Sequence, residues 1–335
     1  RALVLISALA TIAAGKDVSV LFDEFKSKFA KVYESAEVEL QHFENFLKNL
    51  ELVEMMKTMD PSASYSHMSP FADISEADFA SRHSLLVTPE TLHKHKLKAE
   101  SVESRVALPS SFDWRDKGAV TEVKNMGQCR SGWSFAAVCS IEGAKYLATK
   151  NLLSLSEQQL VDCDTTNEGC NGGLPEKAYK YMIVNNMGLE LESEYPYRDD
   201  IFAGPCKAVA SKEKVFISSW KAIATDEDII ATAMMQYGPL AAGINAQSMQ
   251  FYTGGISNPY SCDPYALNHG VALVAFGEED GKKFWRIKNS WGPKWGEDGY
   301  YRIVRGVGKC GINLIVTAVS VNSTQTRAEH PSMLV

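Results

Sequence analysis

The sequence predicts an α+β protein in which a helical N-terminal segment precedes a cysteine-containing unit of helices and strands. Apolar residues recur at helical spacing near the N-terminus, and that segment contains no cysteine. All seven cysteines lie in the remainder of the chain, which also contains strand-like runs such as residues 237–244 and 285–288. With 335 residues, the chain is long enough for two or three compact units with a buried core.

The composition is that of an ordinary globular protein, with 45% hydrophobic and 22% charged residues. The formal charge is −7, from 34 lysines and arginines against 41 aspartates and glutamates, and the basic residues form no stripe. A nucleic-acid partner is therefore not expected.

Residues 1–15 contain one positive charge, a short apolar run and small residues, which is the pattern of a signal peptide. A stable membrane anchor needs about 20 apolar residues, so this run is too short for one. We expect part of a signal peptide that directs the chain into the secretory pathway and leaves no membrane attachment once removed. A buried helix is the alternative.

The next segment, residues 17 to about 106, is charged and predicts a helical hairpin. Its two helices are marked by apolar residues at helical spacing, namely Leu21, Phe22, Phe25, Phe29 and Tyr33, and then Phe43, Phe46, Asn49, Leu50 and Val53. The basic run from His93 to Lys98 is interpreted as a flexible, solvated linker.

Residues 125–135 resemble the nucleophile loop and helix start of papain-type cysteine peptidases. That family has N-Q-G-x-C-G-S-C-W-[AS]-F here, and its second cysteine attacks the peptide carbonyl. In this chain Gly132 stands at the nucleophile position, Met126 at the position of the glutamine that binds the oxyanion, and Arg130 at a glycine position. A helix is predicted from Ser131, as N-cap, to about Lys150.

Two further segments match the rest of such a catalytic centre. Residues 267–273 resemble the family's histidine strand, which makes His269 the matching imidazole. Residues 285–292 resemble its asparagine strand, in which Asn289 would orient His269 and Trp291 would shield their hydrogen bond from water. Ser131 and Ser134 flank position 132, but successive helical residues point about 100° apart, so neither is expected to replace the nucleophile.

The resemblance also implies a peptide-binding cleft. The backbone at Gly172 and Gly173 would pair with an extended substrate. An apolar pocket for a substrate side chain would be formed by Leu174, Pro175, Gly243, Leu267 and Ile315, although ordinary packing explains these residues equally well. Arg130 would place a cation beside the cleft, where it would either obstruct the cleft or attract acidic groups.

The N-terminal segment is similar to the inhibitory propeptide of cathepsin L-type zymogens. Phe46, Asn49 and Val53 fit that propeptide's helix motif, whereas Val38 and His42 depart from it. The expected organisation is a partial signal peptide in residues 1–16 and a polar tail in 321–335, between which the resemblance implies a propeptide in 17–106 and a papain-like domain in 107–320. The domain would consist of a helix-rich half, about 113–217, and a β-barrel-like half, about 218–320, with the cleft between them.

Six of the seven cysteines are expected to pair in an oxidising compartment, although the sequence alone permits many pairings. The resemblance implies Cys129–Cys170, Cys163–Cys206 and Cys262–Cys310, which leaves Cys139 free. About 10 Å along the helix from Gly132, Cys139 is too far away to replace the nucleophile. Asn322 begins a glycosylation signal, which has meaning only in a secreted chain.

These observations indicate a papain-like homologue in proenzyme form that is catalytically inactive and retains a peptide-binding cleft. Two alternatives stay open: an active cathepsin L-like endopeptidase whose sequence carries an inactivating substitution, and a structural or storage protein on the same fold. We expect no cofactor and no metal. The expected partners are the chain's own propeptide and a peptide or protein ligand, with the chain monomeric and located in a lysosome, a vacuole or the extracellular space.

Overall fold

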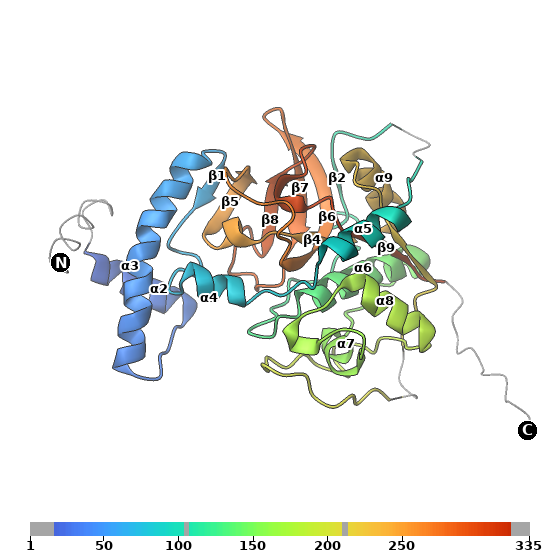
Figure 1. Ribbon diagram of the computed structural model, residues 1–335, viewed down its shortest axis with the longest axis horizontal. Coiled ribbons are helices and arrows are strands. Elements are labelled where there is room, and N and C mark those ends of the chain that lie inside the picture. Colours follow the sequence, from blue (N-terminus) through green and yellow to red (C-terminus); the bar gives the residue numbers. More distant parts are fainter. Residues whose placement is uncertain (1–16, 104–106, 210–213, 323–335) are drawn as a thin grey trace, which may run out of the picture.

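The computed structural model describes residues 17–103, 107–209 and 214–322. The expected signal peptide and most of the expected C-terminal tail lie outside these residues. The chain is an α+β protein with a helical N-terminal segment, which confirms the predicted fold class (Figure 1). No helix in the described ranges is long and apolar enough to cross a bilayer.

The predicted helical hairpin is confirmed as α2, Val18–Phe29, and α3, Ala36–Met59. The ring of Phe22 packs 5.1 Å from that of Phe43 and 5.2 Å from that of Phe46. Helix α2 ends earlier than its apolar spacing predicts, because Ala30 adopts a left-handed conformation (φ 51°). Tyr33 therefore lies outside the helix, and its hydroxyl donates a hydrogen bond to Asp73.

Three further elements belong to the N-terminal segment: β1 (Ala63–Tyr65), α4 (Glu76–Ser81) and α5 (Pro89–Lys98). The linker interpretation of His93 to Lys98 is wrong, because these residues form most of α5. Thr88 caps this helix through its side chain, and Pro89 occupies its first turn. His95 is 1% exposed, and its Nδ1 lies 3.2 Å from the carboxylate of Glu176.

The helix-rich half contains the long, mostly buried α6 (Gly132–Thr149), followed by α7 (Glu157–Cys163), the short 3-10 helix η1 (Gly169–Asn171) and α8 (Pro175–Val184). Helix α5 lies over this half beside α8 (Figure 1). The apolar core of the helix-rich half includes Ile141, Leu160 and Tyr179.

The β-rich half is built on a nine-stranded sheet in the order β1-β5-β8-β7-β6-β4-β9-β3, with β2 also pairing with β6. All pairings are antiparallel except that of β5 with β8. The strands are β2 (Phe112–Asp113), β3 (Ser219–Ala222), β4 (Leu240–Ile244), β5 (Tyr252–Ser257), β6 (His269–Glu279), β7 (Lys282–Lys288), β8 (Tyr300–Val304) and β9 (Val316–Ser320). Helix α9 (Glu227–Tyr237) and two 3-10 helices, η2 (Gln247–Met249) and η3 (Lys309–Gly311), complete this half.

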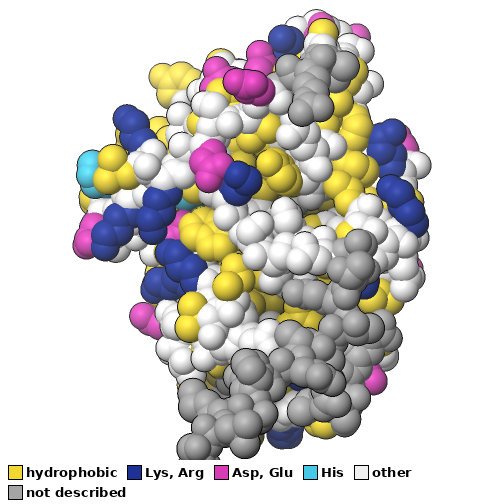
Figure 2. Space-filling model, turned by 90° about the vertical axis from the view of Figure 1, so that its right-hand side faces the viewer, with side chains coloured by type: hydrophobic (Ala, Val, Ile, Leu, Met, Phe, Trp, Pro, Cys, Tyr) yellow, Lys and Arg dark blue, Asp and Glu magenta, His cyan; other side chains and the backbone are white. Residues whose placement is uncertain are grey.

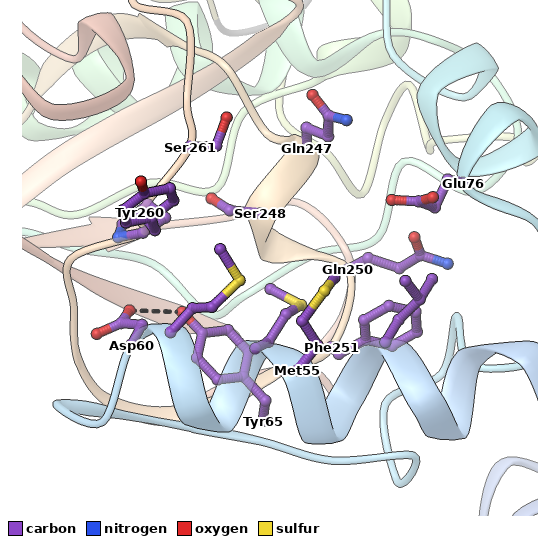
Figure 3. A pocket seen from close by; sticks show the side chains of 14 residues that line it. Met55, Asp60, Tyr65, Glu76, Gln247, Ser248, Gln250, Phe251, Tyr260 and Ser261 are labelled. Carbon is purple, nitrogen blue, oxygen red and sulfur yellow. Dashed lines mark hydrogen bonds between the residues drawn. The ribbon is translucent and has the colours of Figure 1, made fainter.

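The N-terminal segment shares one hydrophobic core with the β-rich half. Strand β1 extends the sheet beside β5. Close to it, Asp60 accepts hydrogen bonds from Tyr65, Ser257 and the backbone of Asn258. A cavity of about 190 Å³ lies here, with methionines of α3 on one side and η2 on the other (Figure 3). The N-terminal segment is thus built into the fold.

The three disulfides join Cys129 to Cys170, Cys163 to Cys206 and Cys262 to Cys310, which are the pairs that the resemblance implies. Cys139 is free and buried. Burial raises the pKa of its thiol to about 11, which keeps it protonated and unreactive.

Charges of both signs are mixed on the face shown in Figure 2, where lysines and arginines lie among carboxylates and apolar side chains.

Candidate active site

Gly132 is the first residue of α6, so its backbone N–H lies at the positive end of the helix dipole. Ser131 is the N-cap residue as predicted, but its hydroxyl makes no capping hydrogen bond. That hydroxyl instead contacts Tyr197 and the carbonyl of Cys129, while the hydroxyl of Ser134 donates to the carbonyl of Ser131. Both serines are fully buried in these contacts, so neither offers a free hydroxyl to an imidazole.

His269 begins β6 and lies beside Gly132. Its Nε2 is 2.8 Å from the side-chain Oδ1 of Asn289, which also accepts the backbone N–H of Ser290. An amide oxygen only accepts, so Nε2 carries the proton and Nδ1 presents a lone pair on the side of Gly132. The indole of Trp291 stacks on the imidazole with ring centroids 5.0 Å apart and covers this hydrogen bond.

The imidazole lies so close to Gly132 that a side chain there has no room. A Cβ on Gly132 would be 2.7 Å from Nδ1 and Cε1 of His269 and 3.2 Å from the carbonyl oxygen of Gly270. The helix terminus and the imidazole that activate a thiol are thus present, but the ring must move before a thiol fits. Burial lowers the pKa of His269 to about 4, although the hydrogen bond that the ring donates to Asn289 acts in the opposite direction.

Met126 lies in the loop before α6 and is 1% exposed. Its backbone N–H donates to Ser290, and its carbonyl accepts from the hydroxyl of Tyr197. The backbone is therefore firmly held next to the Asn289 strand, but the thioether offers no hydrogen-bond donor. Of the two groups predicted to bind an oxyanion, the backbone N–H of Gly132 and the side chain of residue 126, only the former is a hydrogen-bond donor.

Leu85 of the N-terminal segment lies among the side chains that were predicted to line an apolar pocket. The Cβ position of Gly243 would lie 2.8 Å from Leu85, 3.3 Å from Leu267 and 3.8 Å from Ile315, so these groups converge. Leu174 belongs to the same apolar cluster, and Pro175 follows it at the start of α8. Leu85, which is 6% exposed, thus occupies the place predicted for a ligand side chain.

The chain around Leu85 runs along the predicted backbone edge. Leu85 forms a parallel bridge with Gly173, and the N–H of Leu86 donates to the carbonyl of Gly173 at 3.2 Å. The hydroxyl of Ser84 donates to the carbonyl of Asn171. Glycine is needed at 173, because a Cβ there would meet Asn167 and Trp133 within about 2.7 Å.

His83, which the sequence reading did not identify, packs directly on the catalytic-type histidine. The rings of His83 and His269 are 4.9 Å apart, and Trp291 contacts both. Nδ1 of His83 is buried and has no hydrogen-bond partner. Burial, aided by the neighbouring His269, lowers the pKa of His83 well below its ordinary value.

This histidine pair predicts that acid loosens the N-terminal segment. Both rings are neutral when folded, whereas free rings gain protons below pH 6.5. Their contribution is therefore complete above pH 6.5 and is lost as the pH falls toward 4, by up to about 1.4 kcal/mol per pH unit for each ring. Replacing His83 with Phe should flatten the decline in the free energy of unfolding, measured in denaturant from pH 7 to 4.5. Replacing the exposed His93 with Phe should not, and identical slopes for the His83 variant and the wild type would refute the coupling.

No three histidine, cysteine or carboxylate side chains in the described ranges converge as a metal site would require. The site assembled here consists of a helix terminus, an imidazole and amide pair, and a groove occupied by the chain itself.

Comparison with known proteins identifies the family in which this arrangement of residues occurs. Residues 108–320 match the model of the papain family of cysteine proteases, and residues 22–79 match the cathepsin propeptide inhibitor domain. Cysteine proteinase 15A of Pisum sativum is 41% identical over 317 residues, covering 89% of this chain and 85% of its own. Cathepsin F of Mus musculus is 38% identical over 305 residues, covering 90% of this chain and 65% of its own.

Solved proenzymes have the same fold. A digestive procathepsin L 3 from the larval midgut of Tenebrio molitor superposes with a TM-score of 0.81 at 33% identity, covering 91% of this chain and 99% of that one. The recombinant stem bromelain precursor superposes with a TM-score of 0.80 at 29% identity, covering 90% and 98%. The chain therefore belongs to the papain family of cysteine proteases and carries the family's propeptide inhibitor domain.

Proposed function

We propose that this chain is a papain-family homologue in proenzyme form that does not cleave peptide bonds by the family's thiol mechanism. Instead, its groove binds an extended peptide. The observation that carries the proposal is Gly132, which lies against Nδ1 of His269 at the start of α6 and has no nucleophilic atom. Met126 supports it independently, because losing one oxyanion donor costs on the order of 10²–10³ in rate.

The groove's ability to hold a peptide is supported by the segment already in it. Leu85 fills the apolar pocket, and the backbone next to it pairs with Gly173. An external peptide with an aliphatic or aromatic side chain would use the same contacts once this segment leaves. We assign the substrate-side roles to Gly172, Gly173, Leu174, Pro175, Gly243, Leu267 and Ile315, with Trp291 covering His269.

A second candidate is an active cysteine endopeptidase, in which Gly132 is a substitution confined to this sequence. The relatives named as cysteine proteases favour it. Sequencing the source gene at codon 132 separates the two, since a cysteine codon supports activity and a glycine codon removes this candidate.

The direct test is a purified chain whose N-terminal segment has been trimmed away. We expect no hydrolysis of a dipeptidyl fluorogenic substrate and no labelling by an epoxide directed at thiols, together with saturable binding of an uncleaved apolar peptide. Cleavage that the epoxide blocks would reject the proposal.

We further propose that the protein enters the secretory pathway as a monomer, for a lysosome, a vacuole or the exterior. Three disulfides support an oxidising compartment, and Asn322, which is exposed, would then be available for glycosylation.

A further inference from the structure

A second hollow, of about 510 Å³, lies at the seam between the propeptide and the protease part. The end of α4 and Arg82 line it from the propeptide side. Gln128, Arg130 and Asn171 line it from the protease side, beside the Cys129–Cys170 disulfide. Leu85 does not line this hollow. The hollow is therefore open while Leu85 fills the apolar pocket.

The two arginines give the lining of the hollow a net positive charge, because the lining contains a single carboxylate. Among the described residues, neither Arg82 nor Arg130 forms an ion pair or a side-chain hydrogen bond. The one carboxylate in the lining, Asp78, accepts the hydroxyl of Ser75 instead. Two guanidinium groups on one cavity favour a carboxylate, which each can bind through paired N–H donors.

An apolar wall adjoins these cations. Ile201 and Phe202 line the same hollow and are 55% and 72% exposed. Large apolar side chains at such exposure are available to a partner. A carboxylate next to an aromatic or aliphatic side chain is therefore the chemistry that this surface complements.

We propose that the hollow binds an acidic peptide segment in which an aspartate or glutamate neighbours a large apolar residue. The two arginines hold the carboxylate, and Ile201 and Phe202 contact the apolar side chain. Because Arg82 belongs to the propeptide and Arg130 to the protease part, the complete site exists only while the propeptide is docked. Occupancy therefore stabilises the proenzyme, as any ligand that binds one state alone must do. The site requires no catalysis and is separate from the apolar pocket.

The test uses the full chain and two probes that differ only in charge, N-acetyl-Glu-Phe amide and its Gln counterpart. Titration calorimetry should show at least about tenfold tighter binding of the Glu probe, which is the expected size of a charge-assisted hydrogen bond. Arg82→Gln and Arg130→Gln should each reduce this preference, and the double variant should abolish it. Lys282→Gln, which removes an exposed cation on β7, should leave it unchanged.

Equal affinity for the two probes, or a preference that survives the double variant, would overturn the proposal. Both arginines are at least partly exposed, and circular dichroism checks that the variants fold. Leu85→Asp favours release of the propeptide, so it should reduce the preference for the Glu probe over the Gln probe, even though the Phe that both probes share can then enter the emptied apolar pocket. An undiminished preference in a variant that binds apolar peptide more tightly would refute the placement at the seam. Failure here leaves the inactivity proposal intact, and proteolytic activity of the trimmed chain would leave this one intact.

Discussion

Gly132→Cys should restore only weak peptidase activity, whereas Gly132→Cys combined with Met126→Gln should be about 10²-fold more active in kcat/KM. The thiol of the single variant would lie at the N-terminus of α6 beside Nδ1 of His269, where dipole and imidazole favour the thiolate. Its oxyanion would still lack a side-chain donor. One such donor is worth on the order of 10²–10³ in rate, and this sets the expected difference between the variants.

The structure shows that Gly132→Cys also carries a steric cost. A Cβ at residue 132 would lie 2.7 Å from the imidazole, so the ring must shift while Asn289 and Trp291 hold it in place. Part of the weakness of the single variant is therefore expected to come from a displaced His269. Because both variants bear this cost equally, their ratio isolates the oxyanion donor.

The measurement is hydrolysis of a dipeptidyl fluorogenic substrate by trimmed chains, with titration by an epoxide that counts active thiols. Met126→Gln alone is the control and should stay inactive, because it supplies a donor without a nucleophile. Equal kcat/KM values for the single and double variants would contradict the role assigned to Met126.

Much of this site follows from the sequence because its parts lie in short, dense motifs. Residues 125–135, 267–273 and 285–292 each carry several matching side chains, and folding brings His269 to Gly132 and Asn289 to His269. Helices α2 and α3 could also be predicted, because apolar residues such as Phe22, Phe43 and Phe46 recur at helical spacing and pack against one another.

The segment that occupies the groove could not be predicted from the sequence. His83 and Leu85 lie in an irregular stretch, and their burial depends on surfaces that are distant in sequence, at His269 and Gly243. No local pattern distinguishes them from residues of an exposed linker. Tertiary packing alone decides their place.

Helix α5 is a different case, because the sequence contains a helix-start signal that the basic composition of the following residues outweighed in the prediction. Thr88, Pro89 and Glu90 form a typical helix start, with a capping side chain, a proline in the first turn and an early acidic residue. The basic composition that follows indicated a solvated linker instead. The interpretation failed because one side chain, His95, is buried against Glu176 while the lysines stay outside.

Leu85→Asp should open the groove of the full chain. The leucine is 6% exposed among Leu267, Ile315 and the backbone of Gly243, so aspartate would bury a carboxylate with no partner. Losing a buried leucine side chain alone costs about 2–5 kcal/mol, which raises the open fraction roughly 30-fold or more. The apparent affinity for an added apolar peptide should rise in the same proportion, since it scales with the competent fraction.

The matched control is Leu97→Asp, because Leu97 lies on α5 but is 73% exposed. It places the same charge near the same groove without entering the pocket, and should change neither peptide affinity nor cleavage of residues 83–88 by an added protease. Leu85→Asp should accelerate that cleavage. If both variants bind peptide with wild-type affinity, the groove is not the binding surface. If both bind more tightly, charge near α5, rather than release of Leu85 from its pocket, governs access.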